Sequence, residues 1–337
     1  MEDLITLSMP IYNAEKYIEK ALLSALNQTY AHIEYILVDD KGSDNSMEIA
    51  RTLIASHPRK KDVRIIEHSE NSGAGVARST AINNAKGAYI YFMDSDDEIT
   101  ENCIEILYNT MKESPVDFVA ASSVKKDRDG QIFDIQVYTD ETIRGRYEIA
   151  KKFYKTKNRH IPVWNKLYTI SFLRENNIRS IPFNVMEDNL FTFQVVLNAL
   201  SCSYISDLTY FYYDTPKSVV NQSKANKTPE RHANDFIESI NFKIHYIKKI
   251  NDIETRETVY RYIIFQIKHY VTRIHNSVLL TKKQKREYIY KLLVKFPLSF
   301  SEIFKYRQKL FFFFMYFVYK SPFTLQCFKV IDCFSKK

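Results

Sequence analysis

Apolar and polar residues alternate along the first hundred residues in a way that predicts strands and helices in turn. Short, almost continuous apolar runs at 4–10, 33–40, 63–68 and 88–93 predict strands. Segments with apolar residues at helical spacing follow the first three strands, at 14–28, 43–56 and 74–85, and Asn13 is the expected N-cap of the first helix. This alternation predicts an α/β fold, a Rossmann-like and mostly parallel sheet flanked by helices.

The pattern changes twice further along the chain. Residues 101–112 predict a helix and 117–122 a strand, and the pattern stays mixed up to about residue 215. From about residue 228 the spacing of apolar residues is helical. We therefore expect one domain over residues 1–215, made of the halves 1–98 and 99–215, and a helical C-terminal region over 216–337.

Charge is distributed unevenly between these two parts. The chain of 337 residues has a net charge of +8. Residues 1–216 carry 24 basic and 31 acidic residues, whereas residues 217–337 carry 24 basic and 9 acidic ones. An acidic body joined to a basic, aromatic tail indicates two different roles.

Cysteine spacing and the first residues bear on the compartment. The four cysteines, Cys103, Cys202, Cys327 and Cys333, stand far apart and form no CxxC or Cys/His metal pattern. The first ten residues, "MEDLITLSMP", lack the basic and apolar segments of a signal peptide. A reducing cytoplasm is the expected location.

Polar clusters follow three of the predicted strands: "PIYNAE", "DDKGSD" and "DSDDE". Ligands of parallel α/β sheets bind outside the carboxyl ends of the strands. These clusters should therefore share one edge of the sheet. In the third, Asp94 and Asp96 could hold Mg²⁺ or Mn²⁺ and through it a diphosphate, since such cations prefer oxygen ligands. A helix N-terminus would also favour these acids, and the local sequence alone leaves both explanations open.

Several longer segments resemble one enzyme family. "SMPIYNAEKYIEKALLSALNQTYAHIEYILVDDKGSDNS", "ENSGAGVARSTAINNAKGAYIYFMDSDD" and "MEDNLF" occur in this order within about residues 1–215. Together they resemble the inverting family 2 glycosyltransferases of the GT-A fold. The resemblance implies a nucleotide-binding half over 1–98, an acceptor half over 99–215, and metal-dependent transfer of a sugar from a nucleotide sugar.

The resemblance also implies roles for individual residues in donor binding. Nucleoside contacts fall to Pro10, Tyr12, Asn13, Asp39 and Asp40, with Asp40 accepting a hydrogen bond from the base. Diphosphate and sugar contacts fall to Asn71, Arg78, Asp94 and Ser95, and Asp96 with Asp94 would bind the metal, Mn²⁺ or Mg²⁺. The segment departs from the family at Lys41, which precedes Gly42 where the family usually continues Asp-Asp-Gly-Ser. A dinucleotide fingerprint is the competing interpretation of Gly73-x-Gly75, but Arg78 stands where its third glycine would be.

The resemblance places the general base at Asp188, in the Glu187-Asp188 pair. A base there would remove the proton of the acceptor hydroxyl as it attacks the anomeric carbon, which inverts that centre. A helix cap is the alternative explanation of this pair. In "IPVWNKLYT", Trp164 could stack on a sugar ring and Lys166 could reach a phosphate, while core packing is the alternative for the tryptophan.

The tail contains a ten-residue apolar run, 310–319, flanked by Lys305, Arg307, Lys309 and Lys320. This run is shorter than the roughly 20 residues that cross a bilayer. Its basic flanks predict peripheral binding to the anionic inner face of the cytoplasmic membrane, where lipid-linked acceptors lie. Packing on the catalytic domain or contact with a second copy in a homo-oligomer are the alternatives. Nucleic acid is not an expected partner, because the sequence carries none of its binding motifs.

The expected activity is transfer of a hexose from a nucleoside-diphosphate sugar, with UDP as the expected nucleotide, to a saccharide or lipid-linked saccharide. The expected setting is surface-polysaccharide or lipopolysaccharide synthesis. Two alternatives remain. A nucleotidyltransferase would share the sheet and the acids but normally has a glycine-rich loop after the first strand, which "MPIYNAE" lacks. A non-catalytic membrane scaffold would explain the tail but not Arg78, Asp94 and Asp188 together.

Overall fold

The computed structural model describes residues 2–127, 129–156, 161–180, 186–214 and 229–321. The chain forms two compact units, Met1–Ile149 with His160–Ser218, and Ala150–Arg159 with Val219–Lys337. The boundary between them falls within α5 (Glu148–Lys155). The domain limits expected from the sequence, at residues 98 and 215, stay predictions, and Cys327 and Cys333 lie outside the described residues.

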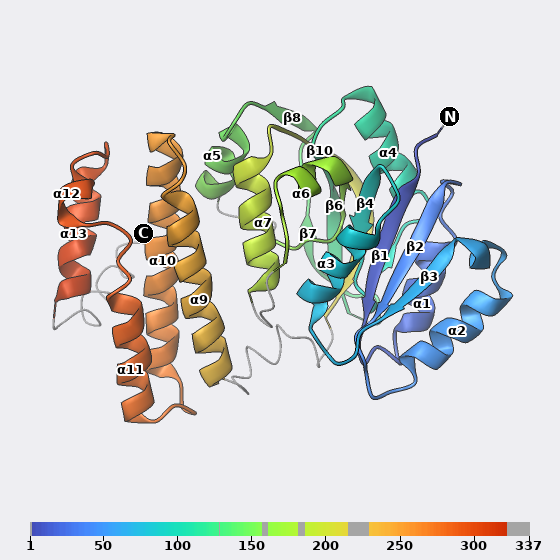
Figure 1. The fold of residues 1–337 in the computed structure, drawn as a ribbon, viewed down its shortest axis with the longest axis horizontal. Helices are drawn as coiled ribbons and strands as arrows, with labels where there is room; N and C mark the ends of the chain where they lie inside the picture. The colour runs from blue at the N-terminus through green and yellow to red at the C-terminus, as the bar shows by residue number, and fades with distance from the viewer. Residues whose placement is uncertain (1, 128, 157–160, 181–185, 215–228, 322–337) are drawn as a thin grey trace. The chain divides into compact units, whose positions relative to one another are not determined.

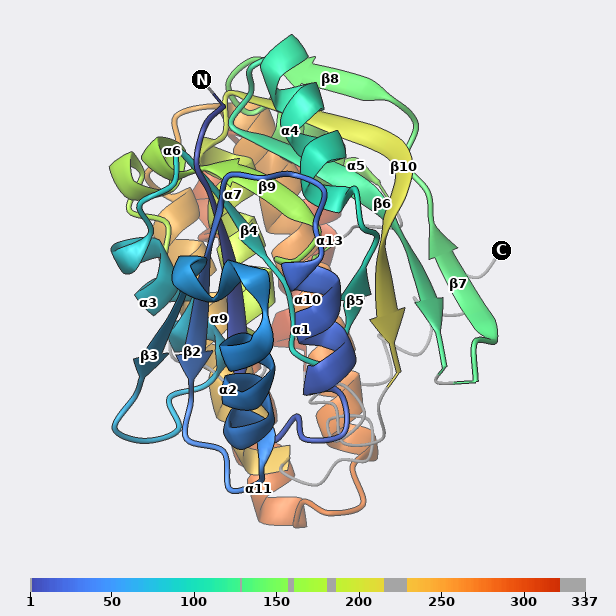
Figure 2. The ribbon, with the colours of Figure 1, turned by 90° about the vertical axis from the view of Figure 1, so that its right-hand side faces the viewer.

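The first unit is built on a sheet that, over the described residues, has ten strands (Figure 2). Eight of them follow the order β3-β2-β1-β4-β9-β6-β10-β5, while β7 pairs with β6 and β8 with β10. The strands are β1 (Ile5–Ile11), β2 (Ile33–Asp39), β3 (Val63–Glu67), β4 (Tyr89–Phe92), β5 (Glu98–Ile99), β6 (Phe118–Lys126), β7 (Ile132–Gln136), β8 (Glu141–Arg144), β9 (Lys166–Thr169) and β10 (Ser201–Tyr213).

Strand direction divides the sheet into two parts. β1 runs parallel to β2 and β4, and β2 runs parallel to β3, as the sequence predicts. β9 is antiparallel to both β4 and β6, and it joins the parallel part to the β6–β10 pair. The sheet is therefore parallel where the nucleotide half was expected and mixed beyond it.

Helices cover both faces of the sheet. Figure 1 shows α1 (Ile18–Leu26) and α2 (Ser46–Ser56) on one side, and α3 (Ala74–Asn84), α6 (Ile170–Glu175) and α7 (Glu187–Asn198) on the other. Alternate residues of β1 pack in one core with α1 and α4 (Cys103–Glu113), as a two-residue period requires. The predicted α/β fold class, with a flanked sheet and a helical C-terminal region, is confirmed.

The expected N-cap of the first helix is wrong. α1 begins at Ile18 with Tyr17 at the N-cap position, and a turn closed by Tyr17 N–H donating to the Ala14 carbonyl comes first. Asn13 lies before this turn with a φ of 50°, in the left-handed region that asparagine tolerates. Its side chain is therefore available for the loop after β2.

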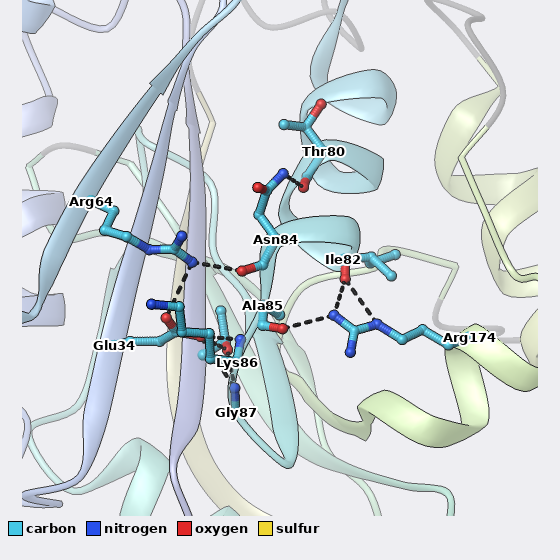
Figure 3. Close-up of polar contacts among 10 residues, drawn as sticks. Glu34, Arg64, Thr80, Ile82, Asn84, Ala85, Lys86, Gly87 and Arg174 are labelled. Carbon is cyan, nitrogen blue, oxygen red and sulfur yellow. Dashed lines mark hydrogen bonds and ion pairs between the residues drawn. The ribbon is translucent and has the colours of Figure 1, made fainter.

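Two arginines hold the C-terminal end of α3 (Figure 3). Arg64 of β3 donates to the Asn84 carbonyl at 2.6 Å. Arg174 of α6 donates to the carbonyls of Ile82 and Ala85, both at 2.7 Å. The last carbonyls of a helix lack partners within it, so these guanidinium groups satisfy them and favour the negative end of the helix dipole. α3 is thus fixed at its C-terminal end, and Arg78, predicted to contact the donor, lies nearer its start.

The second unit is helical, as the sequence predicts. It contains α9 (Pro229–Ile247), α10 (Ile253–Asn276), α11 (Lys282–Leu293), α12 (Phe300–Ile303) and α13 (Lys309–Lys320) (Figure 1). Phe236 of α9 stacks on Tyr270 of α10 with ring centroids 3.9 Å apart. Thr281 and Ser299 each form a capping box at the start of α11 and α12. No helix in the described part of the chain has the length and hydrophobicity needed to cross a bilayer.

Candidate active site

The three polar clusters predicted from the sequence lie at one edge of the sheet. β1, β2 and β4 are parallel and adjacent, so the residues that follow them leave the sheet at the same edge. Tyr12 and Asn13 follow β1, Asp39 ends β2 and Asp40 follows it, and Asp94–Asp96 follow β4 after one residue. This edge is the candidate active site.

Arg78 joins two of the predicted carboxylates. Its Nη1 donates to Oδ1 of Asp188 at 2.7 Å, and its Nη2 donates to Oδ1 of Asp94 at 2.8 Å. The Arg78 side chain is 3% exposed, whereas those of Asp94 and Asp188 are 26% and 29% exposed. α3, the end of β4 and the start of α7 therefore converge on one buried cation whose two partners remain open to solvent.

Charges and burial set the pKa values in this group. Burial disfavours the charged guanidinium, but Asp188, Asp94 and Glu187 raise the pKa of Arg78 above its usual value. Burial also raises the pKa of Asp188, which Arg78 opposes and Asp94 reinforces. Burial and then the Asp188 charge raise the pKa of Glu187 to about 7. A carboxylate pair with raised pKa values beside a cation is suited to proton transfer near neutral pH.

Lys166 lies near the same carboxylates. Its side chain is buried, and its Nζ donates to the Pro162 carbonyl. Burial lowers the pKa of Lys166 to about 7, and the charge of Asp188 opposes this shift. The phosphate contact expected for Lys166 stays a prediction.

Trp164 packs against two tyrosines of β10. Its ring stacks on Tyr210 with centroids 4.3 Å apart and planes 7° apart, and on Tyr212 with centroids 5.7 Å apart. Trp164 is only 7% exposed. This arrangement matches the core-packing alternative more closely than sugar stacking, which stays a prediction.

Asp97 explains how four acidic residues fit at the end of β4. Its carboxylate accepts from the Tyr210 hydroxyl at 2.7 Å and from the Tyr213 N–H at 2.9 Å, and it is fully buried. Burial, Asp96 and Asp94 raise its pKa well above the usual value. Asp97 therefore ties the acidic loop to β10, while Asp94 and Asp96 stay partly exposed and Ser95 is buried between them.

The donor set of Asp94 and Asp96 fits a divalent cation. Two carboxylates, one residue apart and partly exposed, offer the hard oxygen ligands that Mg²⁺ and Mn²⁺ prefer. No group of three or more potential metal-binding side chains occurs among the described residues, so bound phosphate and water would have to complete the coordination.

The loops after β1 and β2 interlock around Gly42. Asn13 Oδ1 accepts from the Ser43 N–H at 2.8 Å, and a Cβ on Gly42 would lie 2.8 Å from the Asn13 nitrogen. Only glycine fits such a close approach. Lys41 takes a φ of 56°, and its Nζ lies 2.9 Å from Glu67. This lysine, a departure from the family pattern, therefore points to the end of β3 and leaves the Asn13 contact intact.

The remaining predicted nucleoside residues differ in exposure. Pro10 lies buried within β1, whereas Tyr12 is 49% exposed directly after it. Asp39 accepts from the Lys41 N–H at 2.9 Å. Asn71 is exposed and accepts from the Gly73 N–H at 3.1 Å.

Sequence reasoning missed His68, whose ring bonds to Asp40 and to Thr80 at 2.8 and 2.9 Å. A signal was present, because His68 directly follows β3 and so belongs to the same edge as the three polar clusters. Tyr210 was also missed as the partner of Asp97, and its position on a distant strand gave no local signal.

Comparisons with known proteins identify a family and a fold. The family described as Glycosyl transferase family 2 matches residues 6–176. The chain is 30% identical to glycosyltransferase GlyA of Streptococcus pneumoniae over 220 residues. These residues cover 63% of this chain and 31% of GlyA. The chain is 32% identical over 223 residues to the poly(ribitol-phosphate) beta-glucosyltransferase of Bacillus spizizenii, which is 62% of this chain and 32% of that protein. The chain thus spans about a third of the length of these two relatives.

A solved structure resembles almost the whole chain. The crystal structure of S. aureus TarS 1-349 in complex with UDP-GlcNAc covers 96% of this chain and 92% of its own, with a TM-score of 0.66 and 20% sequence identity. At that identity the likeness concerns the fold.

Proposed function

We propose a sugar-transfer reaction for this chain, which belongs to glycosyl transferase family 2. The donor is a nucleoside-diphosphate sugar, UDP-linked, and the acceptor is a hydroxyl of a saccharide or a lipid-linked saccharide. The observation that carries the proposal is Arg78, which holds Asp94 of the acidic loop and Asp188 of α7 within 2.8 Å of its two terminal nitrogens. The UDP-sugar complex of a fold neighbour and the polymer named for a relative support the donor and a surface-polysaccharide setting.

Asp188 is the general base of the proposed reaction. Arg78 occupies its Oδ1, so Oδ2 is the oxygen that receives the proton of the acceptor hydroxyl. The acceptor oxygen forms a bond to the anomeric carbon as the bond from that carbon to the diphosphate oxygen breaks. One such displacement inverts the anomeric centre.

Arg78 has two tasks in this scheme. Its fixed fork orients Asp188 and keeps Asp94 close to it, and its positive charge lies where the leaving diphosphate develops charge. Asp94 and Asp96 would hold Mn²⁺ or Mg²⁺, which neutralises charge on the diphosphate when bound. The exposed ring of Tyr12, directly after β1, would stack on the base of the donor.

Release of UDP from a panel of UDP-sugars tests the activity, first without acceptor as slow hydrolysis and then with added saccharides. Release that requires Mn²⁺ or Mg²⁺ and is lost in Asp188→Asn supports the proposal. A purified, folded chain that binds these donors but releases no UDP from any of them, with or without acceptor, contradicts it.

We also propose that the second unit binds the anionic inner face of the cytoplasmic membrane peripherally. Five large apolar side chains on α12 and α13 or directly after α12 are 47–80% exposed: Phe300, Phe304, Leu310, Phe314 and Phe317. We call them the aromatic face of α12 and α13. Three of its rings are contiguous, since Phe300 lies 6.0 Å from Phe304 and 6.3 Å from Phe317 between centroids. The opposite side of α13 is buried, and its Tyr319 hydroxyl donates to the Ile264 carbonyl of α10 at 2.5 Å.

Charge favours an anionic bilayer as the partner of this face. Exposed basic side chains, Lys305, Arg307, Lys309 and Lys320, lie next to the aromatic residues in the chain. Exposed phenylalanines insert among lipid headgroups, and each nearby basic residue adds about 1 kcal/mol of attraction to an anionic surface. Such binding would bring the enzyme to lipid-linked acceptors.

A further inference from the structure

The carboxylate of Asp40 is almost fully engaged by the protein. Its Oδ1 accepts from the Ser72 N–H and faces Nδ1 of His68, both at 2.8 Å, and its Oδ2 accepts from the Gly73 N–H at 2.8 Å. Asp40 is only 2% exposed. A carboxylate has about four acceptor positions, so these contacts leave one, on Oδ2.

In the described part of the chain, His68 is the one side chain among the three groups that hold this carboxylate in its orientation, and the other two are the backbone N–H groups of Ser72 and Gly73. An ionised carboxylate only accepts, so Nδ1 of His68 carries the shared hydrogen, and Nε2 bonds to the Thr80 hydroxyl at 2.9 Å. Thr80 belongs to α3, whose N-cap residue Gly73 donates to Asp40 and whose C-terminal end is held by Arg174. The imidazole is therefore held from both sides, and it cannot turn without breaking one of the two bonds.

Asp40 lies beside the predicted base site. The backbone N–H of Asp40 donates to the Ile11 carbonyl at 3.0 Å, and Ile11 is followed directly by the exposed Tyr12. A ring N–H such as that of uracil could donate a hydrogen bond to the one acceptor position left on Oδ2. A base that presents a lone pair there would leave the buried oxygen unpaired and repelled, which costs affinity.

We propose that His68 is a positioning residue for recognition of the donor's base. Together with the Ser72 N–H, the imidazole holds Oδ1 of Asp40 and leaves Oδ2 for the base, so the site selects uracil over cytosine, which has a lone pair in place of the ring N–H. The inference rests on the proposed function, because it assumes a nucleotide donor at this edge. It adds a residue and a source of base selectivity to that function.

The test compares UDP with CDP by calorimetry in the presence of Mn²⁺, for the full chain and for three variants. We expect the wild type to bind UDP at least about tenfold more tightly than CDP, the discrimination that one hydrogen bond to a charged group supplies. His68→Leu should reduce this ratio to below about threefold by weakening UDP while CDP changes little. His68→Asn keeps an N–H near the position of Nδ1 and should restore most of the ratio.

Thr80→Val removes the second bond of the imidazole and leaves His68 in place, so it serves where His68→Leu does not fold. It should lower the UDP-to-CDP ratio part of the way. Equal weakening of UDP and CDP in these variants would show a role in holding α3 only, and affinities for both nucleotides equal to those of the wild type would show no role. Both results overturn the inference while the proposed function stands. A wild type that binds no nucleotide, or prefers CDP, overturns both.

Discussion

Arg78 and Asp188 form a 2.7 Å ion pair although they lie 110 residues apart in the sequence. The arginine is buried, and the aspartate is 29% exposed at the start of α7. The pair connects α3 to the start of α7 at the residue that we propose as the general base.

Replacing Asp188 by asparagine should stop turnover and keep donor binding. Asparagine retains an oxygen that can accept from Arg78 but cannot take up the acceptor proton. We expect kcat to fall by about 10²–10⁴-fold, the contribution typical of a general base, with UDP affinity changed by less than about threefold. Stopped assays of UDP release and calorimetry measure the two quantities.

The matched control for this variant is Glu187→Gln, one residue away in the same helix start. If Glu187→Gln loses turnover while Asp188→Asn retains it, the base is Glu187, and the assignment of Asp188 is wrong.

Removing the charge of Arg78 should destabilise the first unit. Arg78→Met leaves Asp94 and Asp188 close together without a cation between them. Breaking a buried pair costs about 3–5 kcal/mol, and the partial exposure of the two carboxylates reduces this to about 1–3 kcal/mol. Urea denaturation followed by circular dichroism gives the change in the free energy of unfolding.

Arg78→Lys is the control, because it keeps one charge but cannot donate to both carboxylates in the same fork geometry. It should fold nearly as well as the wild type and bind UDP more weakly. An unfolding free energy of Arg78→Met equal to that of the wild type would mean that the two ion pairs do not stabilise the fold.

Glu187 should make stability fall as pH rises through the range between its two pKa values. Burial and Asp188 raise its pKa in the folded protein to about 7, from an ordinary value of 4.5. Between these values the folded state holds the proton more tightly than the unfolded state, so stability is lost as pH increases. Thermal unfolding from pH 4.5 to 7.5 should therefore show a smaller decrease in Glu187→Gln than in the wild type. Parallel pH curves for the two proteins would argue against a raised pKa at this position.

Much of the first unit could be predicted from local sequence. The period-two and helical patterns locate β1 to β4 and α1 to α3 to within a few residues, and parallel pairing follows from their alternation. The antiparallel insertion of β9 between β4 and β6 was not predictable, since its four residues carry no pattern of their own. Pairing over such a separation is decided by tertiary packing.

The candidate site, too, could be predicted from local sequence only in part. Clusters at strand ends could be found because one topological rule places them together. The burial of Trp164 between β10 tyrosines and the bond from Asp97 to Tyr210 depend on residues that are far away in sequence. The position of His68 directly after β3 places it at the same edge of the sheet, but its bonds to Asp40 and Thr80 could not be read from the sequence.

The aromatic face of α12 and α13 should bind anionic vesicles. Phe314→Ser with Phe317→Ser removes two rings that are 55% and 60% exposed, so the fold should survive. We expect binding to vesicles containing phosphatidylglycerol to weaken at least about tenfold, since each ring loses 1 kcal/mol or more of apolar burial in the interface. Co-sedimentation measures the bound fraction.

Tyr290→Ser is the matched control, because Tyr290 is an aromatic residue of α11 that is 69% exposed outside this face. It should leave vesicle binding unchanged. If the wild type binds no vesicles, the membrane proposal is wrong. If it binds neutral phosphatidylcholine vesicles as well as anionic ones, the electrostatic part of the proposal is wrong. Self-association that is lost in the double variant would instead identify the face as a contact between copies.

The most direct test of a metal-dependent donor site is a calorimetric titration with UDP, with Mn²⁺ and with chelator, for the wild type and Asp96→Asn. We expect UDP to bind the wild type with Mn²⁺ and at least about tenfold more weakly in chelator. Asp96→Asn should show the same loss, because a carboxylate ligand and the cation act together. UDP affinity that is the same with Mn²⁺, in chelator and in Asp96→Asn would contradict it.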